Sequence, residues 1–254
     1  MRNTKKSKVL IIHGWLHSSK RYAELGAKLS KYADVDIYEF EGFGDTKYKS
    51  AKLDILNNYV EKLNNYLINK KYDLVITHSM GGNILLKVLN EYKHNIKYVV
   101  LSNTAYNGLP ILKPIAWIIP MTIVLFIVSK IIPKKIIKPI FSRISLLTVN
   151  ELKYFDDIMF NDALKANSFV ASITLFQLAF DKFTFKTSDI NKDINFIITY
   201  SENDRIIPLK NTKKLICDLS NPVVIKFDKI GHTVALEAEK EYFKQISKLL
   251  ESKV

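Results

Sequence analysis

Short apolar runs alternate with amphipathic stretches along most of this chain, and no other feature constrains its fold as strongly. The apolar runs are rich in β-branched residues, which is typical of strands buried on both faces of a parallel sheet. Six strands are predicted, at 8–12, 35–40, 73–77, 98–101, 194–200 and 223–227. Helices are predicted between and after them, at 22–32, 53–67, 82–92, 167–180, 208–219 and 235–250. This order predicts an α/β protein with about six mostly parallel strands and helices on both faces of the sheet.

The alternation stops after the fourth predicted strand and resumes only at the fifth. Residues 106–165 are apolar and interrupted by prolines, and they follow the carboxyl end of that fourth strand. Ligands of open α/β sheets bind outside the carboxyl ends of the strands, so an insertion leaving this edge would cover the site. We therefore expect a core made of residues 1–105 and 166–254, and a helical lid made of residues 106–165.

The formal net charge of +13 is unevenly distributed. Between residues 105 and 150 there is no acidic residue, but there are six basic ones: Lys113, Lys130, Lys134, Lys135, Lys138 and Arg143. The uncharged stretch 115–128 is short for a membrane span, which needs about 20 residues. It is expected to be a cap helix, with an interfacial segment on an anionic membrane as the alternative. Because no nucleic-acid-binding motif accompanies the charge, no nucleic-acid partner is expected.

The only cysteine of the chain excludes an internal disulfide framework. Cys217 lies in an amphipathic pattern and is expected to pack as a small apolar residue. The apolar run 9–12 is too short for the core of a signal peptide, so a cytoplasmic location is expected, with peripheral membrane contact as a variant of it. The oligomeric state does not follow from the sequence.

The chemistry centres on the stretch Thr77-His78-Ser79-Met80-Gly81-Gly82, which follows the third predicted strand and leads directly into a helix. A nucleophile elbow requires this context, because a sharp strand-to-helix turn exposes a serine hydroxyl. Gly81 is expected where the turn brings backbone segments too close for a side chain. The start of a helix also directs free N–H groups at a bound ligand. The alternative is that Ser79 is an ordinary helix N-cap.

With this stretch the chain resembles the α/β-hydrolase family, in particular its lid-bearing serine esterases and lipases. The resemblance covers almost the whole chain except the insertion. The family elbow is usually Gly-X-Ser-X-Gly, and here Thr77 occupies the first position. The family order places an acid after the next-to-last strand and a histidine after the last one. Asp204 and His232 occupy these positions, so the resemblance implies a catalytic triad of Ser79, Asp204 and His232.

The acid loop also departs from the family pattern, since Ser201 stands where a glycine is common. Two other acids compete with Asp204 for the triad position. Glu202 lies too early in the loop, and Asp228 is too close to His232 in sequence to reach its far side. Both are expected to be solvated.

The stretch Ile12-His13-Gly14-Trp15 resembles the His-Gly-X signature of the same family. The resemblance implies an oxyanion hole formed by the backbone N–H groups of Trp15 and Met80. Gly14 permits a tight turn, and His13 orders the loop without transferring protons. The resemblance implies neither a metal nor an organic cofactor.

The predicted function is hydrolysis of a carboxylic ester, in the carboxylesterase and lipase class EC 3.1.1, through an acyl-enzyme on Ser79. An apolar lid favours a small hydrophobic substrate, such as a monoacylglycerol-like lipid ester. Thioesterases, carbon–carbon bond hydrolases, aminopeptidases and cofactor-free haloperoxidases use the same triad, so the motifs leave them open. A non-catalytic ligand-binding or membrane-associated protein is the alternative from another class.

Overall fold

The computed structural model describes residues 6–116, 119–188 and 190–251. Trp117 and Ile118 of the uncharged stretch therefore lie outside the described residues. Six strands form one parallel sheet in the order β2-β1-β3-β4-β5-β6. Their bounds are β1 Ser7–Ile12, β2 Ala33–Tyr38, β3 Lys71–His78, β4 Asn95–Ser102, β5 Asn195–Ser201 and β6 Val223–Phe227. The prediction of an α/β protein with six parallel strands is confirmed.

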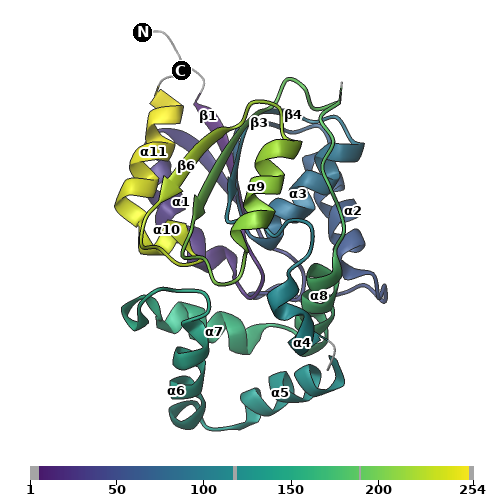
Figure 1. The fold of residues 1–254 in the computed structure, drawn as a ribbon, viewed down its shortest axis with the longest axis vertical. Coiled ribbons are helices and arrows are strands. Elements are labelled where there is room, and N and C mark those ends of the chain that lie inside the picture. The colour runs from purple at the N-terminus through teal and green to yellow at the C-terminus, as the bar shows by residue number, and fades with distance from the viewer. Residues whose placement is uncertain (1–5, 117–118, 189, 252–254) are drawn as a thin grey trace.

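Helices cover both faces of the sheet (Figure 1). Leu10 and Ile12 of β1 pack toward one layer of helices, and Val9 and Ile11 pack toward the other. This double burial explains why the strands are continuous apolar runs. The first layer contains α2 Ile55–Leu67, α3 Met80–Glu91, α8 Ser168–Phe180 and α9 Leu209–Asp218. The second contains α1 Ala23–Leu29, preceded by the short 3₁₀ helix η1 Ser19–Tyr22, with α10 Val234–Glu237 and α11 Glu239–Glu251.

Two expectations for the core were wrong. The last helix is broken into α10 and α11 at Ala238, which has φ −117° and ψ 34°. At this break the carboxylate of Glu237, the last residue of α10, accepts a hydrogen bond from the backbone N–H of Gly231, which precedes the helix. Cys217 is exposed instead of packed. It lies two positions after the buried Leu215, and residues two apart point to different sides of a helix.

The insertion 106–165 is helical and lies beyond the carboxyl ends of the strands (Figure 1). Its elements are η2 Pro110–Leu112, α4 Lys113–Ala116, α5 Ile119–Ile131, α6 Lys134–Ser145, η3 Leu152–Tyr154 and α7 Asp157–Lys165. Its role as a lid, and the division into core and lid domains, stay predictions. Within the described residues no single helix is both long and apolar enough to cross a membrane. In the described part of the chain one pair, α7 with α8, passes the length and composition test together, and the two helices are bent by 97° at their junction.

Candidate active site

Ser79 lies at the sharp turn between β3 and α3, and its backbone is strained. Its φ of 49° and ψ of −114° fall in a region that non-glycine residues rarely occupy. The Ser79 N–H donates to the carbonyl of Ser102 at 3.0 Å, and its own carbonyl accepts from Ala105 at 3.1 Å. The end of β4 therefore holds the turn in place. An ordinary N-cap serine has extended dihedrals and bonds to its helix through its side chain, and Ser79 does neither.

Two glycines allow the loop after β1 to lie against this turn. A Cβ on Gly81 would lie 2.5 Å from the carbonyl oxygen of His13. A Cβ on Gly14 would lie 2.7 Å from the His78 ring and 3.2 Å from Cβ of Ser79. Real Cβ atoms do not approach so closely, so a side chain at either position would separate the two segments. The loop after β1 contacts the turn after β3 because these two strands are neighbours in the sheet.

The two departures from the family pattern are accommodated by hydrogen bonds. The hydroxyl of Thr77 donates to the carbonyl of Val100 on β4 at 3.0 Å. The hydroxyl of Ser201 donates to the carbonyl of Ile230 and accepts from the Asn203 N–H at 3.1 Å. Ser201 thus links the loop that carries Asp204 to the loop that precedes His232.

His13 is fully buried and joins the ends of β1 and β2. Its Nδ1 lies 2.7 Å from the carbonyl oxygen of Gly14, and its Nε2 accepts from the Phe40 N–H at 3.0 Å. Because the carbonyl can only accept, Nδ1 carries the proton. Burial lowers the pKa of His13 to about 4, so the ring is neutral at pH 7. Both nitrogens are occupied by the backbone, which suits a structural role.

Asp204 and His232 form a buried pair at the ends of β5 and β6. His232 Nδ1 lies 2.7 Å from Asp204 Oδ2, and the two side chains are 6% and 2% exposed. The same oxygen accepts from Asn103 Nδ2 at 2.6 Å, while Oδ1 accepts from the N–H groups of Ile206 and Ile207 at 2.7 and 2.9 Å. Burial alone would raise the pKa of Asp204. The nearby His232 and these hydrogen bonds outweigh burial and hold that pKa below its usual range.

All three predicted triad residues lie at the carboxyl edge of the sheet. The His232 ring lies 4.7 Å from the ring of His78, which directly precedes Ser79, so the histidine stands beside the elbow. Ser79 itself is 6% exposed. The structure brings Asp204 and His232 together next to Ser79, and the catalytic roles of the three stay predictions.

The two competing acids lie elsewhere. Both Glu202 and Asp228 pair with Lys226, at 3.1 and 3.2 Å, and both are largely exposed. Neither has a hydrogen bond to His232 among the bonds of the described residues.

Sequence reasoning missed three residues beside the site. Asn103 follows β4 by one position, and the rule that ligands gather at carboxyl strand ends would have found it. His17 and His78 stack face to face, with ring centroids 5.0 Å apart and an angle of 8°. Burial lowers the pKa of both rings well below the usual value, so both are uncharged at neutral pH and stand next to His232. His78 lay inside the elbow motif, but nothing marked His17 as its partner.

The predicted oxyanion donors occupy the two segments that meet at the elbow. Met80 is the first residue of α3, where helical N–H groups lack an intrahelical acceptor. The Trp15 indole donates to the carbonyl of Ala171 at 3.0 Å and meets the Phe126 ring edge-on at 6.3 Å. The side chain of Trp15 therefore bridges α8 and α5, while the role of its backbone N–H stays a prediction.

The segment 146–150, which follows α6 within the insertion, contacts the histidine loop directly. The His232 N–H donates to the carbonyl of Thr148 at 2.7 Å. Asn150 donates from its side chain to the carbonyl of Lys229 at 2.8 Å and from its backbone to Glu237 at 2.6 Å. The insertion is thus tied to the loop that carries the predicted general base.

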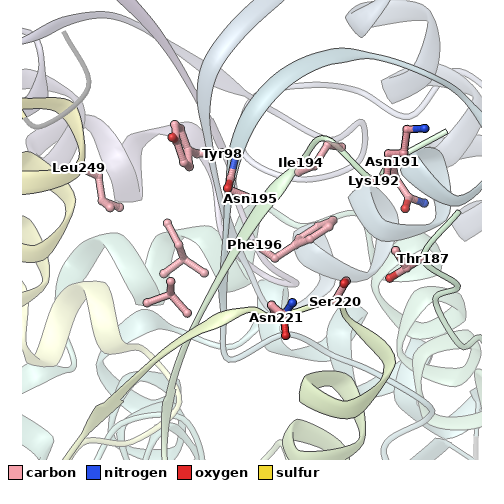
Figure 2. Close-up of a pocket in the computed structure, with 12 residues that line it drawn as sticks. Tyr98, Thr187, Asn191, Lys192, Ile194, Asn195, Phe196, Ser220, Asn221 and Leu249 are labelled. Carbon is pink, nitrogen blue, oxygen red and sulfur yellow. The ribbon is translucent and has the colours of Figure 1, made fainter. Parts of the chain in front are cut away.

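A separate cavity of about 280 Å³ opens at the opposite edge of the sheet. Figure 2 shows Asn195 and Phe196 from the start of β5 beside Ser220 and Asn221, which precede β6. None of the three triad residues lines it, so we do not assign it to the chemistry. In the described part of the chain, no cluster of three or more His, Cys, Asp or Glu residues could hold a metal ion.

The fold and the site geometry define an α/β hydrolase. Residues 3–239 match the family described as serine aminopeptidase, S33, and the chain belongs to this family. No curated protein matches the chain in sequence.

Solved structures share the fold at low identity. An α/β-hydrolase-fold protein from Burkholderia ambifaria has a TM-score of 0.72 and 18% identity, covering 95% of this chain and 90% of its own. An esterase from Exiguobacterium antarcticum has a TM-score of 0.71 and 14% identity, with coverages of 97% and 92%. The 2-hydroxy-6-oxo-6-phenylhexa-2,4-dienoate hydrolase from Rhodococcus sp. strain RHA1 has a TM-score of 0.72 and 15% identity, with coverages of 97% and 91%.

Proposed function

We propose that this protein is a serine hydrolase that cleaves a carboxylic ester of a hydrophobic substrate through an acyl-enzyme on Ser79. The observation that carries the proposal is the buried His232–Asp204 pair, at 2.7 Å, standing beside a serine in a strained strand-to-helix turn. A serine hydroxyl is a weak nucleophile until an oriented base removes its proton.

We assign a role to each group from the His232–Asp204 hydrogen bond and from the place of each residue in its motif. His232 Nδ1–H donates to Asp204, which leaves Nε2 unprotonated to accept the hydroxyl proton as Ser79 attacks the ester carbonyl. The N–H groups of Trp15 and Met80 stabilise the resulting oxyanion. The tetrahedral intermediate expels the alcohol, which takes the proton from His232. A water molecule, deprotonated by His232, then attacks the acyl-enzyme, releasing the carboxylic acid and restoring Ser79.

The surroundings of the elbow favour an apolar acyl group. Trp15 and Phe126 meet next to the predicted oxyanion loop, and the insertion above is apolar and basic. The esterase from Exiguobacterium antarcticum has a similar fold, which supports an ester as the first choice. A monoacylglycerol-like lipid ester fits this description.

Two alternatives use the same catalytic groups. The first is an aminopeptidase, which the family description names. An aminopeptidase needs an acid to bind the free amino group of its substrate. Asp162 in α7 and Asp156 at its N-cap already accept hydrogen bonds from Ser18 and Arg21, which makes these two acids less suited to that role.

The second alternative is a carbon–carbon bond hydrolase. The name of the Rhodococcus neighbour favours cleavage next to a carbonyl, so this is the second candidate function.

The test is hydrolysis of p-nitrophenyl esters of increasing acyl length by the wild type, Ser79→Ala and the control Ser220→Ala, which changes an exposed serine far from the site. We expect Ser79→Ala to lower kcat/KM by at least about a thousandfold and Ser220→Ala to leave it unchanged. The chain-length optimum would then measure the acyl pocket. Equal rates in wild type and Ser79→Ala would overturn the proposal. Absence of turnover on every ester and on aminoacyl substrates would favour a ligand-binding role.

A further inference from the structure

Helix α5 buries polar residues and exposes apolar ones, which is the reverse of a helix in a protein core. Two of its polar residues, Thr122 and Ser129, are 4% and 5% exposed. Five of its large apolar side chains are instead 38–77% exposed: Val124, Leu125, Ile127, Val128 and Ile131. Contiguous exposed apolar surface of this kind marks a contact site for a protein or a membrane.

Helix α6 carries a second exposed apolar face. Ile136, Ile140 and Ile144 follow one another at a spacing of four residues and are 53%, 49% and 55% exposed. Residues at this spacing lie on one face of a helix, so the three form an outward apolar stripe. Only Ile137 among the isoleucines of α6 is buried, and it points toward the protein.

Basic side chains accompany the stripe. Lys134, Lys135 and Arg143 are exposed on α6, and no acidic residue occurs between residues 105 and 150. Lys138 pairs with Asp157 of α7 at 2.5 Å, so this one charge is compensated locally. Apolar residues next to exposed cations are the combination found in helices that lie in a membrane interface.

We propose that the α5–α6 surface, formed by the exposed apolar residues named above with Lys134, Lys135 and Arg143, docks on an anionic phospholipid bilayer. A second copy of the chain would bring one +13 molecule against another and would place these cations opposite each other. Anionic headgroups complement the charge, and the acyl region accepts the isoleucine stripe. The helices lie on the bilayer without crossing it.

The place of this surface gives the docking a consequence. Figure 1 shows α5 and α6 at the end of the molecule away from the chain termini, with α7, α4 and α8 between them and the sheet. Helix α6 leads directly into the segment 146–150, whose Thr148 carbonyl accepts from the His232 N–H. A bilayer bound at α6 is thus connected through the segment 146–150 to the loop that carries His232. The docking itself does not depend on the proposed hydrolysis.

The test is flotation of the full chain with two kinds of vesicle, one of pure phosphatidylcholine and one of equal parts phosphatidylcholine and phosphatidylglycerol. Wild type should float with the anionic vesicles only, and added salt should weaken this. The pair Lys134→Gln and Lys135→Gln should bind about thirtyfold more weakly, since each basic residue near an anionic surface contributes about 1 kcal/mol. The triple change Ile136→Ser, Ile140→Ser and Ile144→Ser should weaken binding at least about tenfold.

Matched controls change residues of the same type elsewhere. Lys240→Gln with Lys248→Gln on α11, and Leu53→Ser with Val223→Ser, alter exposed cations and exposed apolar residues away from the insertion. They should float like wild type, as should Ser79→Ala. Equal recovery of wild type with both vesicle types, or equal effects of the control and α6 variants, would overturn the proposal. So would loss of a dimer by the isoleucine variant with flotation unchanged, because the surface would then bind a second copy.

Discussion

Helices α3 and α5 are similar in length and both are rich in Ile, Leu and Val, yet the structure treats them in opposite ways. In α3 every large aliphatic residue is fully buried, namely Ile84, Leu85, Leu86, Val88 and Leu89. In α5 most are exposed, and Leu125 is 57% exposed. Apolar composition alone therefore does not decide burial in this molecule.

The position of each helix in the topology makes the difference. Helix α3 connects the parallel neighbours β3 and β4, and such a crossover must pack back onto the sheet. Helix α5 belongs to the insertion and packs on α8 and α7 instead of on a strand. An apolar helix inside a βαβ unit predicts core, whereas one in an insertion beyond the sheet leaves a face that needs another partner.

The largest expected contrast comes from truncating one leucine in each helix. Leu85→Ala should lower the free energy of unfolding by about 2–5 kcal/mol, because it removes buried methyl groups and leaves a cavity. Leu125→Ala should change it by less than about 0.5 kcal/mol, since the residue is already 57% exposed. Urea unfolding of both variants measures this. Equal destabilisation would break the comparison between the two helices.

The next effect is the pH dependence of the free energy of unfolding. We expect it to come from the core, because all five histidines lie there and the insertion has none. Since burial lowers the pKa of His13 from 6.5 to about 4, the neutral ring contributes stability that is complete above pH 6.5 and lost as the pH falls toward 4. The full loss for His13 is on the order of 3 kcal/mol. His17 and His78 act in the same direction.

Two buried acids oppose this trend. The pKa values of Asp162 and Glu237 are raised by burial, so their protonation favours the folded state on acidification and reduces the net loss. We expect the free energy of unfolding in urea to fall between about pH 7 and about pH 5, because the three histidines outnumber the two carboxylic acids. A constant or rising value over this range would show that the histidine cluster is not buried as described.

A smaller effect is expected where the two regions join. Asn150→Ala removes the hydrogen bond to the carbonyl of Lys229 and should lower kcat/KM by about tenfold, because the loop carrying His232 loses its alignment. The adjacent Glu151→Gln is the matched control, since among the described residues the Glu151 carboxylate pairs with the exposed Lys153 alone. Both variants should unfold at nearly the wild-type urea concentration. Equal kcat/KM in the two variants would show that the insertion does not position the histidine loop.

Most of the fold follows from local patterns in the sequence. Each predicted strand overlaps an observed one, because strands buried on both faces are the most distinctive apolar runs in a chain. The break at Ala238 could not be predicted, since it accompanies a contact of Glu237 with Gly231 and Asn150 that only the folded chain creates. The exposure of Cys217 depends on the phase of α9, which turns Leu215 toward the core and Cys217 away from it.

The site divides in the same way. Ser79, Asp204 and His232 each belong to a short motif at a strand end, so the sequence alone suggested them. Asn103 and His17 have no motif of their own. Their positions depend on the strand order, which places β4 between β3 and β5 and brings the loop after β1 against the elbow.

The most direct test of the proposed chemistry is to treat the wild-type protein with a fluorophosphonate and to locate the adduct by intact mass and peptide mapping. We predict a single adduct on Ser79, formed at least about a thousandfold more slowly in Asp204→Asn, where the His232 tautomer is no longer held. An adduct on another serine, or equal labelling rates in Asp204→Asn and wild type, would contradict the assignment of Ser79, His232 and Asp204 as one catalytic unit.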